Sequence, residues 1–508
     1  MNQKLMYLQE PKLSFGYGQS LEDPRDGLTL FGPYETFGPY TMQVGVIGTQ
    51  EGAALYEQFV NAMNKPIRSD EERSRPSFPG FQSVFGVVWP NKPAYTHLLD
   101  SQTIGKVLRI PNVRMRTYEA VNTYLREIVK IHEREEVKLD IWILVVPKEI
   151  WLRCRTNAPS TSLSNSHIME VASLKGGQTM MFSDLQAQYE EEAKALDLDW
   201  DFHDQMKARL LQKKIDIPIQ IILEHTLKFK DKYREWTYED RMKAHLAWTQ
   251  SVTMYYKLGK LPWKLANIRK GVCYIGLVFK RYDWGSHQGY ACSAAQMFLD
   301  SGDGTVFRGN IGNWLDKKEK EYHLSYESAR ALLSLAMESY AQRNNCYPQE
   351  LFIHGRADFN DEEWNGFSDI VRQVSSSTRL VGVVIKESGK LKLFRNVEAE
   401  LCEYGNLRGL ALSTSETEGY LWTRGFVPRL NTSTSLEVPN PLRIRTTRGE
   451  ANIEQVLKDI LCLTKLNYNA CIYGDGLPVT LRFSDRIGDI LTAVDTLGDR
   501  VLPFKYYI

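Results

Sequence analysis

Apolar and polar positions follow a regular rhythm along the first half of the chain, in which short apolar runs alternate with longer amphipathic stretches. The apolar runs predict β-strands, and they lie at 41–49, 83–90, 139–147 and 215–224. The stretches between them place apolar residues at helical spacing and predict helices at 51–65, 202–214 and 238–257. The run at 139–147, LDIWILVVP, is almost entirely apolar and ends at a proline, as a strand buried on both faces often does. This order of strands and helices predicts an α/β layer with a parallel sheet.

The strand pattern restarts after a segment rich in helix breakers, KLGKLPWKL at 257–265. Runs at 271–281, 290–300 and 304–310 predict an antiparallel meander. A helix at 325–344, strands at 350–355 and 380–388, and a final strand at 478–485 flanked by helices complete the pattern. We therefore expect two α/β units, residues 1–263 and 264–508. Residues 156–200 are more polar and predict an excursion from the core, with one exposed helix at 183–198.

Composition and charge exclude several classes of protein. The chain has 508 residues, 63 Lys and Arg against 62 Asp and Glu, and a net charge of +1, so a phosphate site has to come from local clustering of cations. The seven cysteines form no CxxC pair, so the sequence does not predict a zinc site. An odd, scattered set of cysteines is typical of reduced cytoplasmic proteins. No apolar run is long enough to span a membrane, and the first residues lack the features of a signal peptide.

Four polar residues stand at spacings that could bring them together. His203 and Lys207 are four residues apart and share one face of the predicted helix. Gln220 lies within an apolar strand, and Lys257 precedes a glycine turn. Each also has an ordinary explanation: a solvated helix face for the first two, a hydrogen-bonded core amide for Gln220, and a favourable helix C-terminus for Lys257.

In this order and spacing, the four residues resemble the MID domain of Argonaute proteins, and the second half is similar to the PIWI domain. The resemblance implies a Rossmann-like MID domain followed by an RNase H-like PIWI domain, with His203, Lys207, Gln220 and Lys257 binding the 5′-phosphate of a guide strand. Thr253 occupies a position where many Argonautes have a second lysine. The resemblance further implies that the terminal carboxylate of Ile508 helps hold Mg²⁺ against that phosphate.

The PIWI resemblance also implies that the catalytic acids are missing. The first Asp of the family's active site falls on Val278, in YIGLV, and the second falls on Arg356 or Ala357, in FIHGRAD. Asp485, after the run PVTLRFS, falls at or near the fourth ligand, although the helical pattern that follows favours a helix N-cap. The third ligand has no identifiable counterpart. Two-metal cleavage requires several carboxylates to hold the ions, so we expect no nuclease activity.

The length and the opening segments, such as DPRDGLTLFGPYE at 23–35, are most similar to short prokaryotic Argonautes that pair with a TIR–APAZ protein. This resemblance implies an RNA guide, a single-stranded DNA target and a defence role against plasmids or phage. The effector, such as a TIR NAD-hydrolase, would then belong to the APAZ-containing partner.

Two alternatives stay open at this point. One is an active guide-dependent endonuclease with acids at other positions, and the other is an unrelated α/β structural or interaction protein. The charged stretch 228–243 contains many cations together with acids and aromatic residues. It fits a solvated surface, or a contact with a guide or target backbone.

Overall fold

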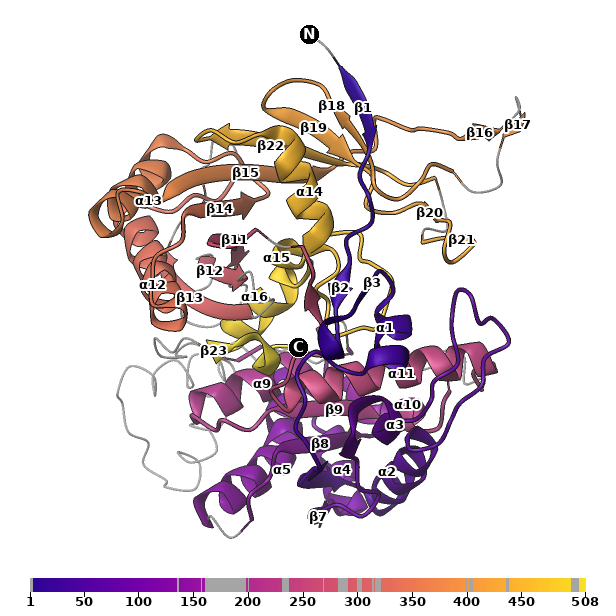
Figure 1. Cartoon of the computed structure of the whole chain (residues 1–508). Helices are drawn as coiled ribbons and strands as arrows, with labels where there is room; N and C mark the ends of the chain where they lie inside the picture. The colour runs from indigo at the N-terminus through magenta and orange to yellow at the C-terminus, as the bar shows by residue number, and fades with distance from the viewer. Residues whose placement is uncertain are drawn as a thin grey trace, which may run out of the picture.

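The structure is a computed structural model, shown in Figure 1. It describes residues 3–134, 137–156, 158–159, 198–199, 201–230, 237–267, 269–281, 291–298, 304–312, 315, 321–397, 400–401, 405–434, 438–494 and 502–508. The helix predicted at 183–198 lies outside these residues, apart from Leu198. In the described part of the chain, no helix has the length and apolar composition that crossing a membrane requires.

The first unit is built on a four-stranded parallel sheet with helices on both faces. Its strand order is β7 (Tyr95–Leu98), β5 (Val44–Gly48), β8 (Ile141–Val146) and β9 (Ile219–Leu223). All six residues of β8 are buried, as the apolar run predicted, because alternate side chains enter two different cores. Ile141, Ile143 and Val145 pack on one face of the sheet, and Trp142, Leu144 and Val146 pack on the other.

Helices cover both faces of this sheet and position the polar residues discussed below. Buried residues of α2 (Gln50–Met63) and α11 (Asp240–Lys257) share the core of the first face. The second face is covered by α4 (Ser101–Leu108), α5 (Val113–Arg134) and α9 (Phe202–Gln212). The helices predicted at 51–65, 202–214 and 238–257 are therefore confirmed, within a few residues at each end.

The second unit is built on a ten-stranded mixed sheet, in the order β1-β18-β19-β22-β15-β14-β11-β12-β13-β23. The strands are β1 (Lys4–Tyr7), β11 (Val272–Arg281), β12 (Ala291–Phe298), β13 (Gly304–Gly312), β14 (Glu350–Gly355), β15 (Arg379–Glu387), β18 (Leu410–Ser413), β19 (Glu418–Leu421), β22 (Leu442–Arg448) and β23 (Leu502–Pro503). The antiparallel meander of β11, β12 and β13 is confirmed. β14 and β15 extend the sheet in parallel on the other side of β11.

Two groups of helices cover the two faces of the large sheet (Figure 1). Alternate residues of β11 and β14 pack against α12 (Tyr326–Asn344) and α13 (Asp361–Val374). The other residues of these strands share a core with α14 (Ile453–Leu463), α15 (Val479–Arg482) and α16 (Ser484–Thr492). The helix predicted at 325–344 is confirmed as α12.

Two of the predicted strands are wrong, in whole or in part. The run at 478–485 forms α15 and the start of α16, because Pro478 precedes a helix and the main chain of α15 packs directly on β11. A Cβ atom on Gly276 would lie 1.9 Å from the carbonyl oxygen of Thr480, so this close approach requires glycine. Asp485 is the second residue of α16 rather than its N-cap.

At 83–90, α3 (Phe81–Phe85) ends at Gly86, which has a left-handed φ of 67°. Only β6 (Val87–Val88) of this run is a strand.

Segments near both ends of the described chain link the first unit to the second. Strand β1, from the N-terminal segment, pairs with β18 at the edge of the large sheet. Strand β23, near the other end, pairs with β13, and residues 507 and 508 reach α9 of the first unit. The two units are therefore connected by the segment around residue 263 and also by the two ends of the described chain.

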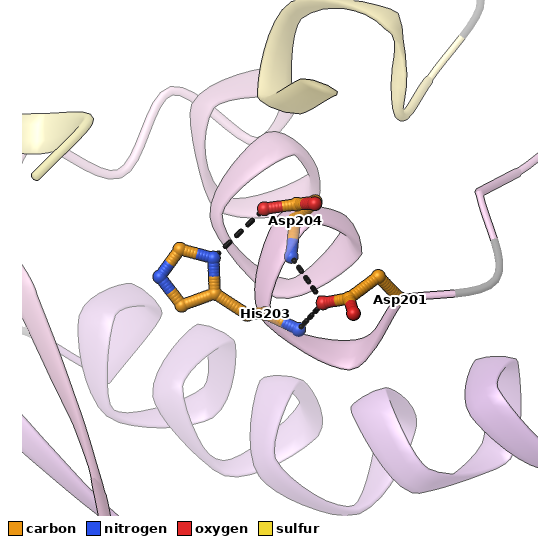
Figure 2. Close-up of side chains that lie close together, drawn as sticks. All are labelled: Asp201, His203 and Asp204. Atoms are coloured by element: carbon orange, nitrogen blue, oxygen red, sulfur yellow. Dashed lines mark hydrogen bonds and ion pairs between the residues drawn. The ribbon is translucent and has the colours of Figure 1, made fainter. Parts of the chain in front are cut away.

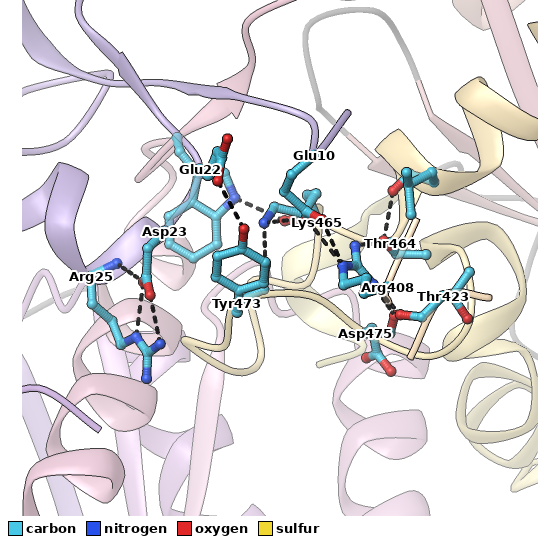
Figure 3. A network of polar contacts seen from close by, with 12 residues as sticks. Glu10, Glu22, Asp23, Arg25, Arg408, Thr423, Thr464, Lys465, Tyr473 and Asp475 are labelled. Carbon is cyan, nitrogen blue, oxygen red and sulfur yellow. Dashed lines mark hydrogen bonds and ion pairs between the residues drawn. The ribbon is translucent and has the colours of Figure 1, made fainter. Parts of the chain in front are cut away.

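A buried ionic network fixes the N-terminal crossing (Figure 3). The carboxylate of Glu10 accepts hydrogen bonds from Arg408 Nε, at 2.9 and 3.1 Å, and from Lys465 Nζ, at 2.9 Å. Arg408 and Lys465 belong to the second unit, and their side chains are 1% and 0% exposed. Burial alone would raise the pKa of Glu10, but Arg408 and Lys465 lower it below its ordinary value.

Replacing Glu10 by Ala should therefore destabilise the protein strongly. The change leaves two buried cations without their carboxylate, which costs about 3–5 kcal/mol in comparable buried pairs. Urea unfolding should show a clear loss for Glu10→Ala and a loss below about 1 kcal/mol for Glu454→Ala, which breaks an exposed pair with Lys4. The extra loss of unfolding free energy in Glu10→Ala should be at its full value above pH 4.5, the ordinary carboxyl pKa. It should disappear as the pH falls through the lower pKa that Glu10 has in the folded state. Equal losses for the two variants would show that the network does not hold the N-terminal segment.

Candidate nucleic-acid interface

A cavity of about 800 Å³ lies where the two units meet. Strands β8 and β9 and the start of α9 line one side, while segment 467–470 and helices α15 and α16 line the other. Its lining residues are Val146, Trp151, Cys154, Asp201, Phe202, His203, Asp204, Ile221, Leu223, Asn467, Asn469, Ala470, Arg482, Phe483, Arg486 and Asp489. A site of this kind at a junction between two units is a usual place for a ligand.

His203 stands on the wall of this cavity, at the first turn of α9 (Figure 2). The helix begins there because Asp201 is its N-cap, and Asp201 Oδ1 accepts hydrogen bonds from the main-chain nitrogens of His203 and Asp204 at 2.9 and 3.4 Å. His203 Nδ1 lies 2.8 Å from Asp204 Oδ1. Burial and the nearby charge of Lys207 lower the pKa of His203 well below its ordinary value, so the imidazole offers a neutral ring to the cavity.

Lys207 lies one turn further along α9 and is buried. Its ammonium group donates to the main-chain oxygens of Tyr507 at 3.1 Å and Ile508 at 2.7 Å. The i,i+4 spacing predicted that His203 and Lys207 share a helix face. The contact with residues 507 and 508 joins segments about 300 positions apart, and the spacing of residues could not predict it.

Lys257 and Gln220 form a direct contact, although they are on different elements. Lys257 ends α11 and is buried, and its ammonium group donates to Gln220 Oε1 at 2.6 Å and to the main-chain oxygen of Ile219 at 2.8 Å. The structure therefore brings these two predicted residues together. Thr253 is also buried, and its hydroxyl donates to the carbonyl oxygen of Thr249 within the same helix.

The two buried lysines share an unusual electrostatic situation. The acceptors are main-chain oxygens and the amide oxygen of Gln220, and the Ile508 oxygen among them belongs to the terminal carboxylate. No Asp or Glu side chain among the described residues forms an ion pair with either ammonium group. Burial, together with the charge of Arg486, lowers the pKa of Lys207 to about 7. Burial and the charge of Lys207 lower the pKa of Lys257 well below its ordinary value. A bound anion would reverse both effects.

Arg486 is the site residue that sequence reasoning missed. It lies on α16, lines the cavity with an exposed side chain, and its charge acts on His203, Lys207 and Lys257. The second unit thus supplies a third cation. Thr253, in the first unit, carries no charge and cannot supply one. The short motif SDRIG gives no signal for this role, because the contact depends on how α16 packs at the junction.

Acidic groups line the cavity beside His203, whereas Lys207, Gln220 and Lys257 are not among its described lining residues, and both lysines are buried. One donor atom from each of Asp201, His203 and Asp204 lies within 4.8 Å of the others, so the three could hold a metal ion. Burial and the nearby Asp489 raise the pKa of Asp204 to about 7, and burial and Asp204 raise the pKa of Asp201 to about 6. The carboxylate oxygens suit Mg²⁺, although Asp201 already serves as a helix cap.

A second, smaller cavity of about 280 Å³ contains two of the positions that the resemblance aligns with the family's catalytic acids. Val278 and Arg356 line it together, so the structure brings these two positions into one site, and Ser484 stands beside them. Asp485 follows Ser484 in α16. Glu321 also lines this cavity, although no position for the third acid could be located in the sequence.

Three described cations of the stretch 228–243 form ion pairs with acidic residues. Lys228 pairs with Glu51 at 2.7 Å, Lys243 with Asp240 at 2.9 Å, and Arg241 with Glu71. These contacts fit a solvated surface. Residues 231–236 of this stretch lie outside the described residues.

Comparisons with known proteins place the fold. Neither a protein-family model nor a curated sequence matches the chain. Among solved structures, Clostridium butyricum Argonaute, bound to a guide DNA and a 19-mer target DNA, matches with a TM-score of 0.66 at 15% identity. That match covers 100% of this chain and 55% of the other. The chain has the Argonaute fold.

Two further Argonaute-fold structures agree. Aquifex aeolicus Argonaute matches with a TM-score of 0.53 at 14% identity, covering 99% of this chain and 57% of the other. Drosophila Piwi matches with a TM-score of 0.56 at 12% identity, covering 99% and 56%. The predicted fold class, a Rossmann-like MID domain followed by an RNase H-like PIWI domain, is confirmed. The chain spans about half the length of the structures it matches.

Proposed function

We propose that this chain binds the 5′-phosphate of a guide strand and uses base pairing of that guide to recognise a complementary target. The observation that carries the proposal is the pair of buried ammonium groups, Lys207 and Lys257, which have no Asp or Glu partner among the described residues and have Arg486 nearby. A terminal phosphate carries roughly two negative charges and several acceptor oxygens, and it would supply the counter-charge. The neutral ring of His203 on the cavity wall suits stacking with the first base.

Our proposal for the type of nucleic acid rests on the similarity of this chain to Argonaute proteins. The matched Clostridium protein is bound to a guide DNA and a target DNA, and an Aquifex Argonaute structure contains an externally bound siRNA. We propose an RNA guide and a single-stranded DNA target for this chain, because its motifs are most similar to short Argonautes. In this arrangement, base pairing reads the target sequence while the protein holds the guide by its end and backbone.

Mg²⁺ at the guide phosphate is part of the proposal. Its ligands would be a phosphate oxygen and the terminal carboxylate of Ile508, and such an oxygen-rich set fits this ion. The Ile508 oxygen accepts a hydrogen bond from Lys207, so the ammonium group and the metal ion would compete for it.

We further propose that the chain does not cut its target and that a partner supplies the response. Val278 cannot bind a metal ion, and the guanidinium of Arg356 would repel one. The partner would be an APAZ-containing protein, such as a TIR NAD-hydrolase, that acts in defence against plasmids or phage once target is bound. The alternative is an active guide-dependent endonuclease. Glu321 and Asp358 line the second cavity, and their carboxylates are the groups that such an enzyme would need to hold metal ions.

The phosphate pocket can be tested with Lys207→Met and Lys257→Met. Each variant should lose roughly tenfold or more in affinity for a 5′-phosphorylated guide, because a charge-assisted hydrogen bond is worth about 1.5–3 kcal/mol. Binding of a 5′-hydroxyl guide should change little. The melting temperature should fall, because methionine leaves the buried oxygen acceptors of each ammonium group without a donor. Lys213→Met, on the exposed end of the same helix, is the matched control. Equal loss for both guides would place the lysines away from the phosphate.

The absence of cleavage can be tested directly. With guide, complementary target and Mg²⁺ or Mn²⁺, the chain should bind the target and leave it intact in a denaturing gel assay. Val278→Asp should remain inactive, since Arg356 still stands where a second ligand is needed. Metal-dependent cutting by the unmodified chain would establish the endonuclease alternative instead.

A further inference from the structure

A small antiparallel sheet joins the N-terminal segment to the linker between the two units. Its strand order is β10 (Lys264–Leu265), β2 (Leu13–Ser14) and β3 (Ser20–Leu21). Leu13 and Leu265 are 0% and 2% exposed and point into the core. Because side chains alternate along a strand, Lys264 and its cross-strand partner Ser14 point away from the core. One face of this sheet is therefore directed outward.

The linker that forms β10 is the source of positive charge on this face. Residues 257–270 contain five lysines and arginines and no Asp or Glu. The ammonium groups of Lys260 and Lys264 lie over aromatic rings, 5.5 Å from the ring centre of Phe37 and 4.4 Å from that of Tyr34. Both lysines are half-buried, and no carboxylate among the described residues forms an ion pair with either of them. Their charge is therefore available to an anion.

A third lysine connects this surface to the pocket proposed for the guide. A Cβ atom on Gly259 would lie 3.2 Å from Lys505 Nζ, so this ammonium group stands beside the residue that precedes Lys260. Three residues further along the chain, an Ile508 oxygen accepts a hydrogen bond from Lys207. The surface thus begins next to the pocket in which Lys207 is buried.

Two acids stand on the neighbouring segments, and each has a donor of its own. Glu35 Oε2 accepts from the main-chain nitrogen of Leu261 at 2.9 Å. Glu22, which follows β3, accepts from the hydroxyl of Tyr473 at 2.9 Å. Neither carboxylate pairs with a lysine of this surface among the described residues.

The turn between β2 and β3 presents an aromatic ring to solvent beside these lysines. Tyr17 is 92% exposed and has a left-handed φ of 58°, which bulky residues seldom adopt. Gly16 holds the turn against the chain, since a Cβ atom there would lie 2.3 Å from the main-chain oxygen of Phe31. Tyr34, the ring beneath Lys264, follows three residues after Phe31. A strained backbone that exposes a ring gains no packing in return, which indicates a role in binding.

We propose that Tyr17, Lys260, Lys264 and Lys505 bind the single-stranded part of the target that continues past the 5′ end of the guide. Lysines contact phosphates without regard to sequence, and an exposed ring stacks on any base, so this combination suits a single strand. Because paired strands are antiparallel, the target passes the 5′ end of the guide in its own 3′ direction. This inference rests on the proposed function, which places the 5′ end of the guide in the neighbouring pocket.

The test uses the guide-loaded full chain and DNA targets that carry the complementary segment alone, with a 3′ oligothymidine extension, or with a 5′ one. The 3′ extension should raise affinity roughly fivefold or more, and the 5′ extension should not. Tyr17→Asn should remove this gain without lowering the melting temperature, because asparagine tolerates a left-handed φ, and Tyr17→Phe should keep the gain. Lys264→Ala should lower the slope of log affinity against log salt by about 0.7, for the 3′-extended target only.

The controls are residues of the same kinds on the second unit. Tyr347→Asn changes a tyrosine that is 39% exposed, and Lys390→Ala removes an exposed lysine. Both variants should keep the full gain from the 3′ extension.

Each other outcome contradicts a stated part of the account. Equal gains from the two extensions, or a gain that Tyr17→Asn leaves intact, overturn the inference while normal guide loading leaves the proposed function standing. If Tyr17→Asn instead prevents binding of a partner protein and the gain persists, the turn is a protein contact and the inference is overturned. A chain that loads no guide contradicts the proposed function, and the inference falls with it.

Discussion

Two buried ammonium groups at the junction of the two units form the constraint around which the rest of the site is arranged. Burying a charged amine is unfavourable unless a counter-charge or several hydrogen-bond acceptors compensate it. The described acceptors of Lys207 and Lys257 are main-chain oxygens, an oxygen of the terminal carboxylate of Ile508 and one amide oxygen, and burial lowers the pKa of each lysine. A bound anion would therefore favour the charged form of both lysines.

This arrangement depends on the connections between the two units. Residues 507 and 508 supply oxygens to Lys207, and α16 of the second unit supplies Arg486. The buried contact of Glu10 with Arg408 and Lys465 fixes the opposite end of the chain on the second unit. The geometry of the pocket is therefore a property of the whole chain, because neither unit alone contains all of its groups.

Sequence patterns correctly predicted the features that depend on the local spacing of apolar and polar residues. The apolar run at 139–147 and the helical spacing of His203 and Lys207 correctly indicated a buried strand and a shared helix face. The four predicted pocket residues include one pair in direct contact, Lys257 and Gln220.

The failures concern long-range packing. The run at 478–485 reads as a strand but forms α15 and the start of α16, which pack over Gly276. Arg486 and Glu321 gave no local signal, because only the assembled fold brings them to their cavities.

The central claim is that the pocket holds lysines that become fully charged when a phosphate binds. Calorimetry in buffers of different ionisation enthalpy measures it directly, as the number of protons taken up when guide binds at pH 8, where the phosphate itself is already fully ionised. Since the pKa of Lys207 is about 7 in the free chain and rises on binding, a 5′-phosphorylated guide should cause an uptake of roughly one proton or more beyond that of a 5′-hydroxyl guide. Equal proton uptake for the two guides would contradict the account.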